Sequence, residues 1–433
     1  MKKEKRSDPA LLDKNLKKKL SKQKMQKIYF KALKKLPRNV WIVAITSFMT
    51  DVSSEMIINT LPLFLKNVLG VKTSVIGLIE GVAESTASFL KLYSGWISDK
   101  LKKRKILAVL GYGISALSKP LFYFANSWGL VAAARWGDRV GKGVRTAPRD
   151  ALVADSTAQS QRGFAFGFHR AADTAGAFAG LLIAFLIVWL LQSGSNELKA
   201  NTFRILVLVS LLPAALAVII LAAGAKDIPA ASAATPPRFG FKSLGKNFII
   251  FVMIVGIFEL GNSSDAFIIL RAQERGLSIA GIFAMLIAFN FVYTVIALPA
   301  GKLSDRVGRR RIIMAGWAMY VLTYLGLAIA RSAVHIVILY VMYGAYYGLS
   351  YGTAKAMVAD LVLPQSRGMA YGTYNAVLGL TDLPASLIAG ILWSGVGTWK
   401  GFGPSAPFYF GAAMAFLALI MFAFWKPIPA DGS

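Results

Sequence analysis

The chain has 433 residues, 56% of them hydrophobic and 16% charged, and a mean hydropathy of +0.55. Soluble domains average about 25% charged residues, so this composition indicates a membrane protein. The absence of cysteine excludes disulfides and thiolate metal sites, and two histidines leave little for a nitrogen-ligated metal. A net charge of +28 is typical of nucleic-acid-binding proteins, but in a membrane protein the positions of the charges carry more information than their sum.

Residues 1–38 form a basic segment before the first long apolar run. Asp8 and Pro9 are start signals for a helix, and Leu12 and Leu16 follow at helical spacing among many lysines. This segment is interpreted either as an amphipathic helix on an anionic inner leaflet or as a solvated basic tail. No cleavable signal is expected, because the first apolar run begins too late for one and is long enough to span a bilayer.

Twelve apolar runs follow, each near the 20 residues that cross a bilayer as a helix. They predict an all-α membrane protein with twelve transmembrane helices. The predicted helices cover residues 41–65, 74–97, 106–124, 128–151, 164–191, 204–222, 247–270, 279–301, 312–330, 334–358, 370–394 and 405–425.

Basic residues gather in alternate loops. They crowd residues 1–38, 100–105, 226–246 and 306–311, whereas the loops in between, such as 125–128, are short or nearly neutral. The positive-inside rule therefore predicts that both termini lie in the cytoplasm, and we expect the protein in the bacterial inner (cytoplasmic) membrane. No basic patch with interleaved aromatic residues remains outside this pattern, so no nucleic-acid partner is expected.

Three acids lie inside apolar runs of the first half of the chain. Asp51 and Glu55 are one helical turn apart on the helix 41–65, and Asp173 lies on the helix 164–191. Two like charges in a partly dry site favour protonation of one of them. Asp51, Glu55 and Asp173 are therefore the candidates for the transported proton.

Other polar residues accompany these acids. Arg170 and Arg139 are candidates to compete with the proton for an ionised carboxylate. His169 and Arg170 are also candidates for the substrate cavity, although His169 is interpreted more readily as a hydrogen-bonded interior residue than as a ligand. Glu80, near a helix end, is interpreted as a solvated acid.

The stretch DRVGKGVRTAPRD at residues 138–150 resembles a phosphate-binding loop at first sight. Walker A requires Gly-x-x-x-x-Gly-Lys-(Ser/Thr), whereas Gly137 to Gly143 offers one residue too few and a glycine after the lysine, so ATP binding is not expected. The stretch instead continues the helix 128–151, and six charged residues fall on one face of it. This charged stripe consists of Arg135, Asp138, Arg139, Lys142, Arg145 and Arg149.

The charged stripe has two interpretations. Charged side chains within the membrane are costly unless they pair with one another or face water. Asp138 and Lys142 have the i, i+4 spacing of an ion pair. The stripe is therefore either a structural and gating network or a contact for an anionic group of a substrate.

An internal repeat of about 205 residues divides the chain. GWISDKLKKRK at residue 95 recurs as GKLSDRVGRRR at residue 301, and VADSTAQSQRGFAFG at 153 recurs as VADLVLPQSRGMAYG at 358. We therefore expect two pseudo-symmetric six-helix bundles, residues 39–223 and 247–433, joined by a cytoplasmic linker, 224–246. Such an arrangement places a binding site between the halves near the middle of the bilayer.

The second half replaces most of the charged stripe with phenols. At the 205-residue offset, Tyr343 and Tyr347 take the positions of Asp138 and Lys142. These tyrosines are interpreted either as a wall for a flat or partly apolar ligand or as packing residues between helices. Further candidates for the cavity, on the helix 247–270, are Glu259, Asn262 and Asp265.

The repeated loops resemble those of the major facilitator superfamily, and the resemblance covers roughly residues 39–426. The loop of the family is Gly-x-x-x-Asp-(Arg/Lys)-x-Gly-Arg-(Arg/Lys)-(Arg/Lys). The first copy has Gly95 and Asp99 but Lys102 in place of the second glycine, so its turn is expected to differ. The second copy fits fully, with Gly301, Asp305, Arg306, Gly308, Arg309, Arg310 and Arg311. The resemblance implies the major facilitator fold, with these loops as gating latches between the halves.

We therefore expect a secondary transporter, not an enzyme, that exports a small amphipathic organic compound in exchange for protons. It is expected to need no cofactor or metal, to act as a monomer, and to have as partners its substrate, protons and a bilayer with an anionic inner leaflet. Uptake of an organic anion remains an alternative, as does divalent metal export through oxygen-rich ligands. The residues for metal export would be Asp51, Glu55, His169 and Asp173. A sensor or scaffold is disfavoured, because it would give the intramembrane charges no role.

Export is suggested in part by two glycines. Gly176 and Gly180 match the helix pattern of drug antiporters of the family, but Leu181 stands where proline is expected. The same glycines are also interpreted as residues that allow two helices to pack closely.

Overall fold

The computed structural model describes residues 33, 36–101, 103–158, 161–228, 244–362 and 367–425. Within these ranges the chain forms helices and loops and no β-strand. The predicted basic tail and cytoplasmic linker fall largely outside the described residues.

The helices follow the predicted spans to within a few residues. Those of the first half are α2 (Arg38–Ile58), the short α3 (Leu61–Leu63) and η1 (Phe64–Val68), α4 (Thr73–Leu101), α5 (Arg104–Tyr123), α6 (Trp128–Asp155), α7 (Arg162–Gln192) and α8 (Ala200–Gly224). Those of the second half are α9 (Lys246–Gly261), α10 (Ala266–Glu274), α11 (Ile279–Val307), α12 (Arg309–Ile329), α13 (Ala333–Asp360), α14 (Arg367–Ser394) and α15 (Ala406–Phe424). With α3 and η1 counted as part of the first rod, and α10 as part of the α9 rod, the described residues form six rods in each half.

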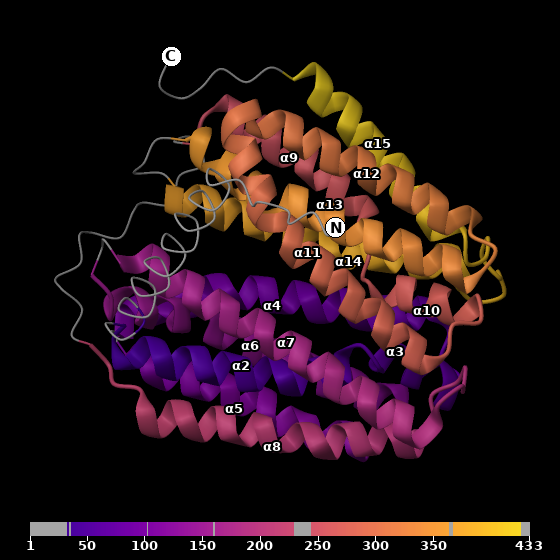
Figure 1. Cartoon of the computed structure of the whole chain (residues 1–433), viewed down its shortest axis with the longest axis horizontal. Coiled ribbons are helices and arrows are strands. Elements are labelled where there is room, and N and C mark those ends of the chain that lie inside the picture. The colour runs from indigo at the N-terminus through magenta and orange to yellow at the C-terminus, as the bar shows by residue number, and fades with distance from the viewer. Residues whose placement is uncertain are drawn as a thin grey trace, which may run out of the picture.

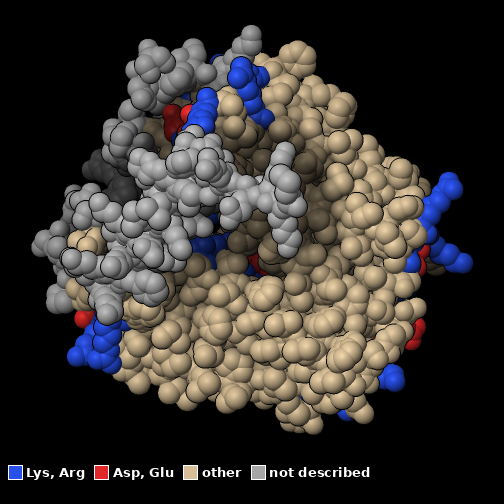
Figure 2. Space-filling view, in the orientation of Figure 1, with Lys and Arg blue, Asp and Glu red and all other residues tan. Residues whose placement is uncertain are grey.

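Most of these rods are suited to a bilayer. Ten are long enough and apolar enough to cross a membrane. The other two, α4 and α6, have 29 and 28 residues, and several of their charged side chains are buried inside the molecule. Figure 2 shows most of the visible charged atoms near the ends of the rods, with a nearly uncharged belt between them. The molecule is therefore a multi-pass all-α membrane protein.

The two halves lie side by side (Figure 1). Helix α4 packs along α14 and α7 packs along α11, and these contacts join the halves. The two loops of the repeated motif, α4–α5 and α11–α12, lie at one end of the rods, which we call the motif end. The loops 193–199 and 395–405 lie at the other end, called the opposite end.

The first rod of each half is broken, whereas the sequence predicted one continuous helix in each case. In the first half the break precedes Pro62, which has no N–H to continue the helix. Thr60 Oγ1 donates there to two carbonyl oxygens of the preceding turn, at 2.8 and 3.1 Å. In the second half, residues 262–265 separate α9 from α10. Breaks of this kind are tolerated within a membrane only where protein groups or water satisfy the freed backbone.

Helices α4 and α14 are in close contact between the opposite end and the middle of the rods. A Cβ atom on Gly77 would lie 2.2 Å from the carbonyl oxygen of Ser386, so only glycine fits this contact. Further along, Ser85 Oγ donates to the carbonyl oxygen of Gly379 at 2.8 Å.

Hydrogen bonds at the opposite end also join the halves. Gln273 Nε2 donates to Asn67 Oδ1 at 2.7 Å, and the N–H of Ile279 donates to the carbonyl oxygen of Ser195 at 3.0 Å. The halves are thus held together at the opposite end.

Two glycines bring α7 against α2. A Cβ atom on Gly176 would lie 2.4 Å from the carbonyl oxygen of Phe48, and one on Gly180 would lie 2.6 Å from that of Val52. This confirms that they allow close helix packing. The contact places Asp173 of α7 near the acids of α2.

We expect Gly176→Leu to lower the melting temperature of the purified protein, because the added atoms have no space between α7 and α2. Overpacking of this kind costs about 1–3 kcal/mol. Gly167→Leu, on the same helix, is the matched control, because a Cβ atom there would meet nothing within 4 Å. Equal melting temperatures for the two variants in detergent would contradict the packing described here.

Candidate functional site

The motif loop of the second half is a one-residue link between two helices. Gly308 follows α11 and precedes α12 with φ of +94°, a conformation that residues with a side chain rarely adopt. Next to it, Arg309 Nη1 lies 2.8 Å from Asp305 Oδ1, and Arg309 Nε contacts Asp360 at the end of α13. Arg306 is exposed.

The first motif loop has an equivalent ion pair. Arg104 Nε lies 3.3 Å from Asp155 Oδ2 at the end of α6, and both residues stand 205 positions before their counterparts in the second half. Lys102, where the turn was expected to differ from that at Gly308, lies outside the described residues, so this expectation stays a prediction.

Both ion pairs fix a motif loop to a helix end of the same half. The side chain of Asp99 lies outside the described ones, Gly95 lies against Ala147 of α6, and Gly301 borders the cavity described below. A latch between the two halves stays a prediction.

The charged stripe of α6 is buried against α4. Arg135 is 2% exposed, and its Nη2 lies 2.6 Å from Glu80 Oε2 and 3.2 Å from Glu84 Oε1. Glu80 is 4% exposed, so its interpretation as a solvated acid is wrong. Glu80 faces α6 and serves as the partner of a buried arginine.

Asp138 and Arg139 extend these ion pairs. Arg139 lies 3.2 Å from both Asp138 Oδ2 and Glu84 Oε1, and Arg135 Nη1 lies 3.9 Å from Asp138 Oδ2. Asp138 thus pairs with the two arginines of its own helix, while Lys142, the partner suggested by the sequence, is half-buried nearby. We call Glu80, Glu84, Arg135, Asp138 and Arg139 the buried charge network.

The other two arginines of the stripe have different partners. Arg145 Nη1 donates to Ser115 Oγ at 2.6 Å, and its guanidinium carbon lies 4.6 Å from the centre of the Tyr112 ring. Arg149 Nη2 lies 2.8 Å from Asp150 Oδ1.

The three candidate proton carriers are near one another. Asp51 interacts electrostatically with Glu55 and Asp173, and also with Arg145 and Arg149 of α6. All three acids are half-buried. The structure therefore brings together acids from α2 and α7 beside the basic residues of α6.

Polar partners surround these acids. Asn59 Nδ2, at the helix break, donates to Glu55 Oε2 at 2.8 Å. His169 is buried, with Nε2 at 2.8 Å from Ser47 Oγ and 3.6 Å from Asp173 Oδ1, which agrees with an interior hydrogen-bonded residue. Arg170 is more exposed and lies 4.0 Å from Asp173.

Among the described residues, no group of three or more His, Asp or Glu side chains could hold a metal ion. In this conformation Asp51, Glu55, His169 and Asp173 are therefore not gathered into such a group.

A similar acid and amide lie at the break in the second half. Asn262 Nδ2 donates to Glu259 Oε2 at 2.8 Å, and Tyr343 Oη donates to Asn262 Oδ1 at 3.2 Å. The arrangement parallels Glu55 and Asn59 in the first half. Each half thus places a glutamate with an asparagine partner where its first rod is interrupted.

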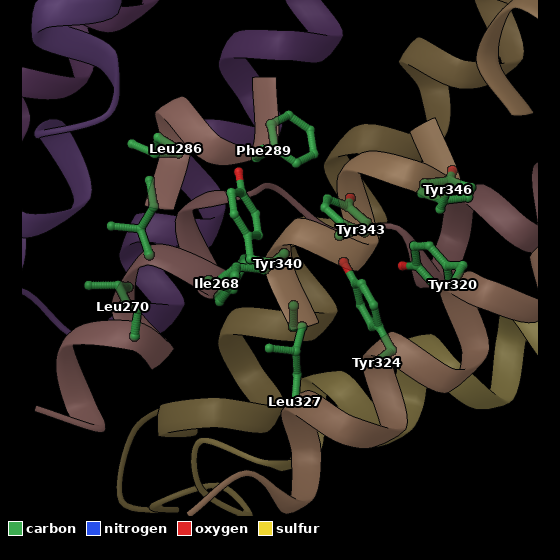
Figure 3. Close-up of a cluster of buried hydrophobic side chains, with 14 of the residues drawn as sticks. Ile268, Leu270, Leu286, Phe289, Tyr320, Tyr324, Leu327, Tyr340, Tyr343 and Tyr346 are labelled. Atoms are coloured by element: carbon green, nitrogen blue, oxygen red, sulfur yellow. The ribbon is translucent and has the colours of Figure 1, made fainter. Parts of the chain in front are cut away.

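Tyr343 is a core residue in this conformation. It is 0% exposed, and its ring lies in an aromatic cluster from α12 and α13 (Figure 3). Rings that pack against it are those of Tyr320, Tyr324, Tyr340, Tyr346 and Tyr347. The packing interpretation therefore fits Tyr343, whereas Tyr347 is half-buried and stacks on Tyr351, which borders the cavity.

A cavity of about 440 Å³ lies between the halves, in the part of the rods nearer the motif end. Its walls come from α6 and α7 of the first half and α11 and α13 of the second. Three predicted site residues of α7, His169, Arg170 and Asp173, line it. The buried charge network does not. In the space-filling view, charged atoms are visible in the hollow between the halves (Figure 2).

Three ionisable residues were missed by the sequence analysis. Lys119 of α5 is 3% exposed and donates to the hydroxyls of Ser53 and Ser54 on α2. Lys355 of α13 lines the cavity, and Asp382 of α14 interacts electrostatically with charged residues of α4 and α6. Each stands inside a predicted apolar span, and such a position is by itself a signal of function.

Comparison with known proteins shows the relationships of the chain. The family model of the Major Facilitator Superfamily matches residues 43–284 and 249–433. An uncharacterized transporter of this type from Methanocaldococcus jannaschii is 36% identical over 399 residues, which cover 90% of this chain and 96% of the relative. The class B tetracycline resistance protein of Escherichia coli is 30% identical over 159 residues, 36% of this chain and 37% of that protein.

A solved structure has the same fold. The crystal structure of the nucleoside transporter NupG matches with a TM-score of 0.69 at 15% identity, over 90% of this chain and 100% of the other. The two sets of six rods, the repeated loops and the match to the family model together establish that the chain belongs to the major facilitator superfamily of secondary transporters.

Proposed function

We propose that the protein exports a small amphipathic organic compound in exchange for protons by alternating access. The observation that carries this proposal is the position of Asp51, which interacts electrostatically with both Glu55 and Asp173 and with Arg145 and Arg149 of α6. Such an acid can hold a proton in one conformation and face a basic side chain in another, so that proton binding favours one arrangement of the helices.

The sidedness of the cavity is compatible with export. The positive-inside rule places the basic motif end, and with it both termini, in the cytoplasm. In this orientation the cavity lies toward the cytoplasm, while the contacts between α4 and α14 hold the opposite end together. An exporter in the bacterial inner membrane takes up its substrate on this side.

The choice of substrate has separate support. The cavity is lined by both aromatic and charged residues, which suits an amphipathic compound. The partial match to a tetracycline resistance protein supports export and makes tetracycline the first probe. We propose that a monomer is sufficient, because both walls of the cavity come from one chain.

The test is transport of tetracycline by the purified full chain in proteoliposomes with an imposed pH gradient. The proposal requires accumulation against the tetracycline gradient, accompanied by proton movement in the opposite direction. Accumulation that is unaffected by collapse of the pH gradient would refute proton coupling.

We expect Asp51→Asn, Glu55→Gln and Asp173→Asn, made separately, to identify the proton carrier. Loss of the carrier should abolish uphill, pH-driven transport. Tetracycline should still bind to the Asp51 and Glu55 variants, because neither residue lines the cavity, whereas Asp173 does and its variant is also tested for weaker binding. Proton and tetracycline fluxes are measured together, with Glu197→Gln in an exposed loop at the opposite end as the control. Wild-type accumulation in all three variants would show that these acids are structural.

We expect Asp305→Asn to slow transport at least about tenfold, equivalent to about 1.4 kcal/mol of activation free energy. The substitution removes a charge from the motif loop, where Asp305 pairs with Arg309, but it touches no core contact. Initial rates and melting temperature are compared with those of wild type and Glu197→Gln. A normal rate would refute the role of this loop as a latch.

We expect Arg135→Met to destabilise the protein, because it leaves Glu80 buried without its partner. Removing one member of a buried ion pair costs about 3–5 kcal/mol. The double variant Arg135→Met/Glu80→Gln should recover part of the lost melting temperature, and Arg331→Met, at an exposed position, is the control. If instead Arg135→Met kept its melting temperature but bound tetracycline more weakly, the stripe would contact the substrate.

A further inference from the structure

We infer that the cavity between the halves binds an organic anion with a flat apolar part. In this site Arg170 and Lys355 flank the acid group, and the ring lies against Tyr351 and Tyr293. The inference rests on the proposed transport function, to which it adds the class of substrate.

The charges that line the cavity favour an anion. Its basic residues are Arg149, Arg170 and Lys355, and its acids are Asp150 and Asp173. Asp150 is paired with Arg149 at 2.8 Å, and Asp173 lies 3.6 Å from His169 and 4.0 Å from Arg170. Both acids therefore already have a basic side chain beside them, so neither carboxylate is free to pair with a cationic ligand.

Lys355 lacks such a partner. No carboxylate lies within 4 Å of its ammonium group among the side chains that the structure describes. Its Nζ lies 4.6 Å from the centre of the Tyr351 ring and 3.4 Å from Tyr351 Oη. An ammonium group that has only a phenol beside it is free to bind the acid group of a ligand.

Arg170 approaches the same tyrosine from the other half. It lies beside Tyr293 of α11 and interacts electrostatically with Tyr351, and its side chain is 62% exposed. The two basic groups, one on α7 and one on α13, therefore face the same cavity from opposite halves. An anion between them would contact both halves at once, so its binding would depend on how far the halves are apart.

Two aromatic rings complete the site. The rings of Tyr293 and Tyr351 supply apolar surface, and 440 Å³ falls within the range of drug-sized sites, about 300–1,000 Å³.

The test compares three naphthalene probes that differ in charge: 2-naphthoate, uncharged 2-naphthamide and the 2-naphthylmethylammonium cation. Binding to the purified full chain in detergent is measured by isothermal titration calorimetry. We expect 2-naphthoate to bind at least about tenfold more tightly than the other two, as charge-assisted hydrogen bonds allow.

Variants assign the binding to this cavity. Arg170→Gln and Lys355→Gln should each weaken 2-naphthoate binding about tenfold, with little change for 2-naphthamide. Arg170→Lys and Lys355→Arg should retain most of the affinity. Arg331→Gln, an exposed basic position at the opposite end, should leave all three probes unaffected, and melting temperatures confirm that each variant is folded.

The inference is overturned if the three probes bind equally well, if the cation binds most tightly, or if both glutamine variants bind 2-naphthoate as wild type does. Transport in proteoliposomes separates this result from the proposed function. Binding of 2-naphthoate without any pH-driven transport would refute the function and keep the site, whereas pH-driven tetracycline export without 2-naphthoate binding would refute the site alone.

Discussion

The cost of placing a charged side chain in an apolar bundle shapes this molecule more than any other constraint. An isolated charge at membrane depth is expensive, so each one must find a partner inside the protein. Arg135 and Arg139 of α6 find theirs in Glu80, Glu84 and Asp138. The resulting network fixes α6 against α4, and α4 in turn carries the contacts to α14 that join the two halves.

The same constraint separates structural charges from candidate functional ones. Arg271, at the opposite end, is 1% exposed and has its donors occupied by carbonyl oxygens near the end of α12 and by Glu274, so its role is to hold the second half together. Lys355 has a phenol beside it but no acid within ion-pair distance among the described residues. A charge that the protein itself leaves uncompensated is available to a ligand or a proton.

The interiors of the two halves contain different kinds of side chain. The first half contains an ionic interior on α4, α6 and α7, whereas the second half packs tyrosine and phenylalanine rings around Tyr343 (Figure 3). Both halves nonetheless interrupt their first rod near a glutamate with an asparagine partner, Glu55 with Asn59 and Glu259 with Asn262. The cavity forms where the ionic half meets the aromatic one, and it therefore offers a ligand both charge and flat apolar surface.

Local information in the chain was enough to predict the rods, the two halves and the motif loops. The length of an apolar run and the position of basic loops are local properties, so the span 106–124 matched α5 closely. Local information did not determine which neighbours the charged side chains would face, because these neighbours come from other helices. Glu80 and Arg135 lie 55 positions apart, and only the packing of α4 on α6 made the acid a buried partner instead of a solvated one. Lys355 and Arg170 likewise became one candidate site because α13 and α7 face the same cavity. The periodicity of residues along a single helix cannot predict this contact, because it depends on how the two halves pack.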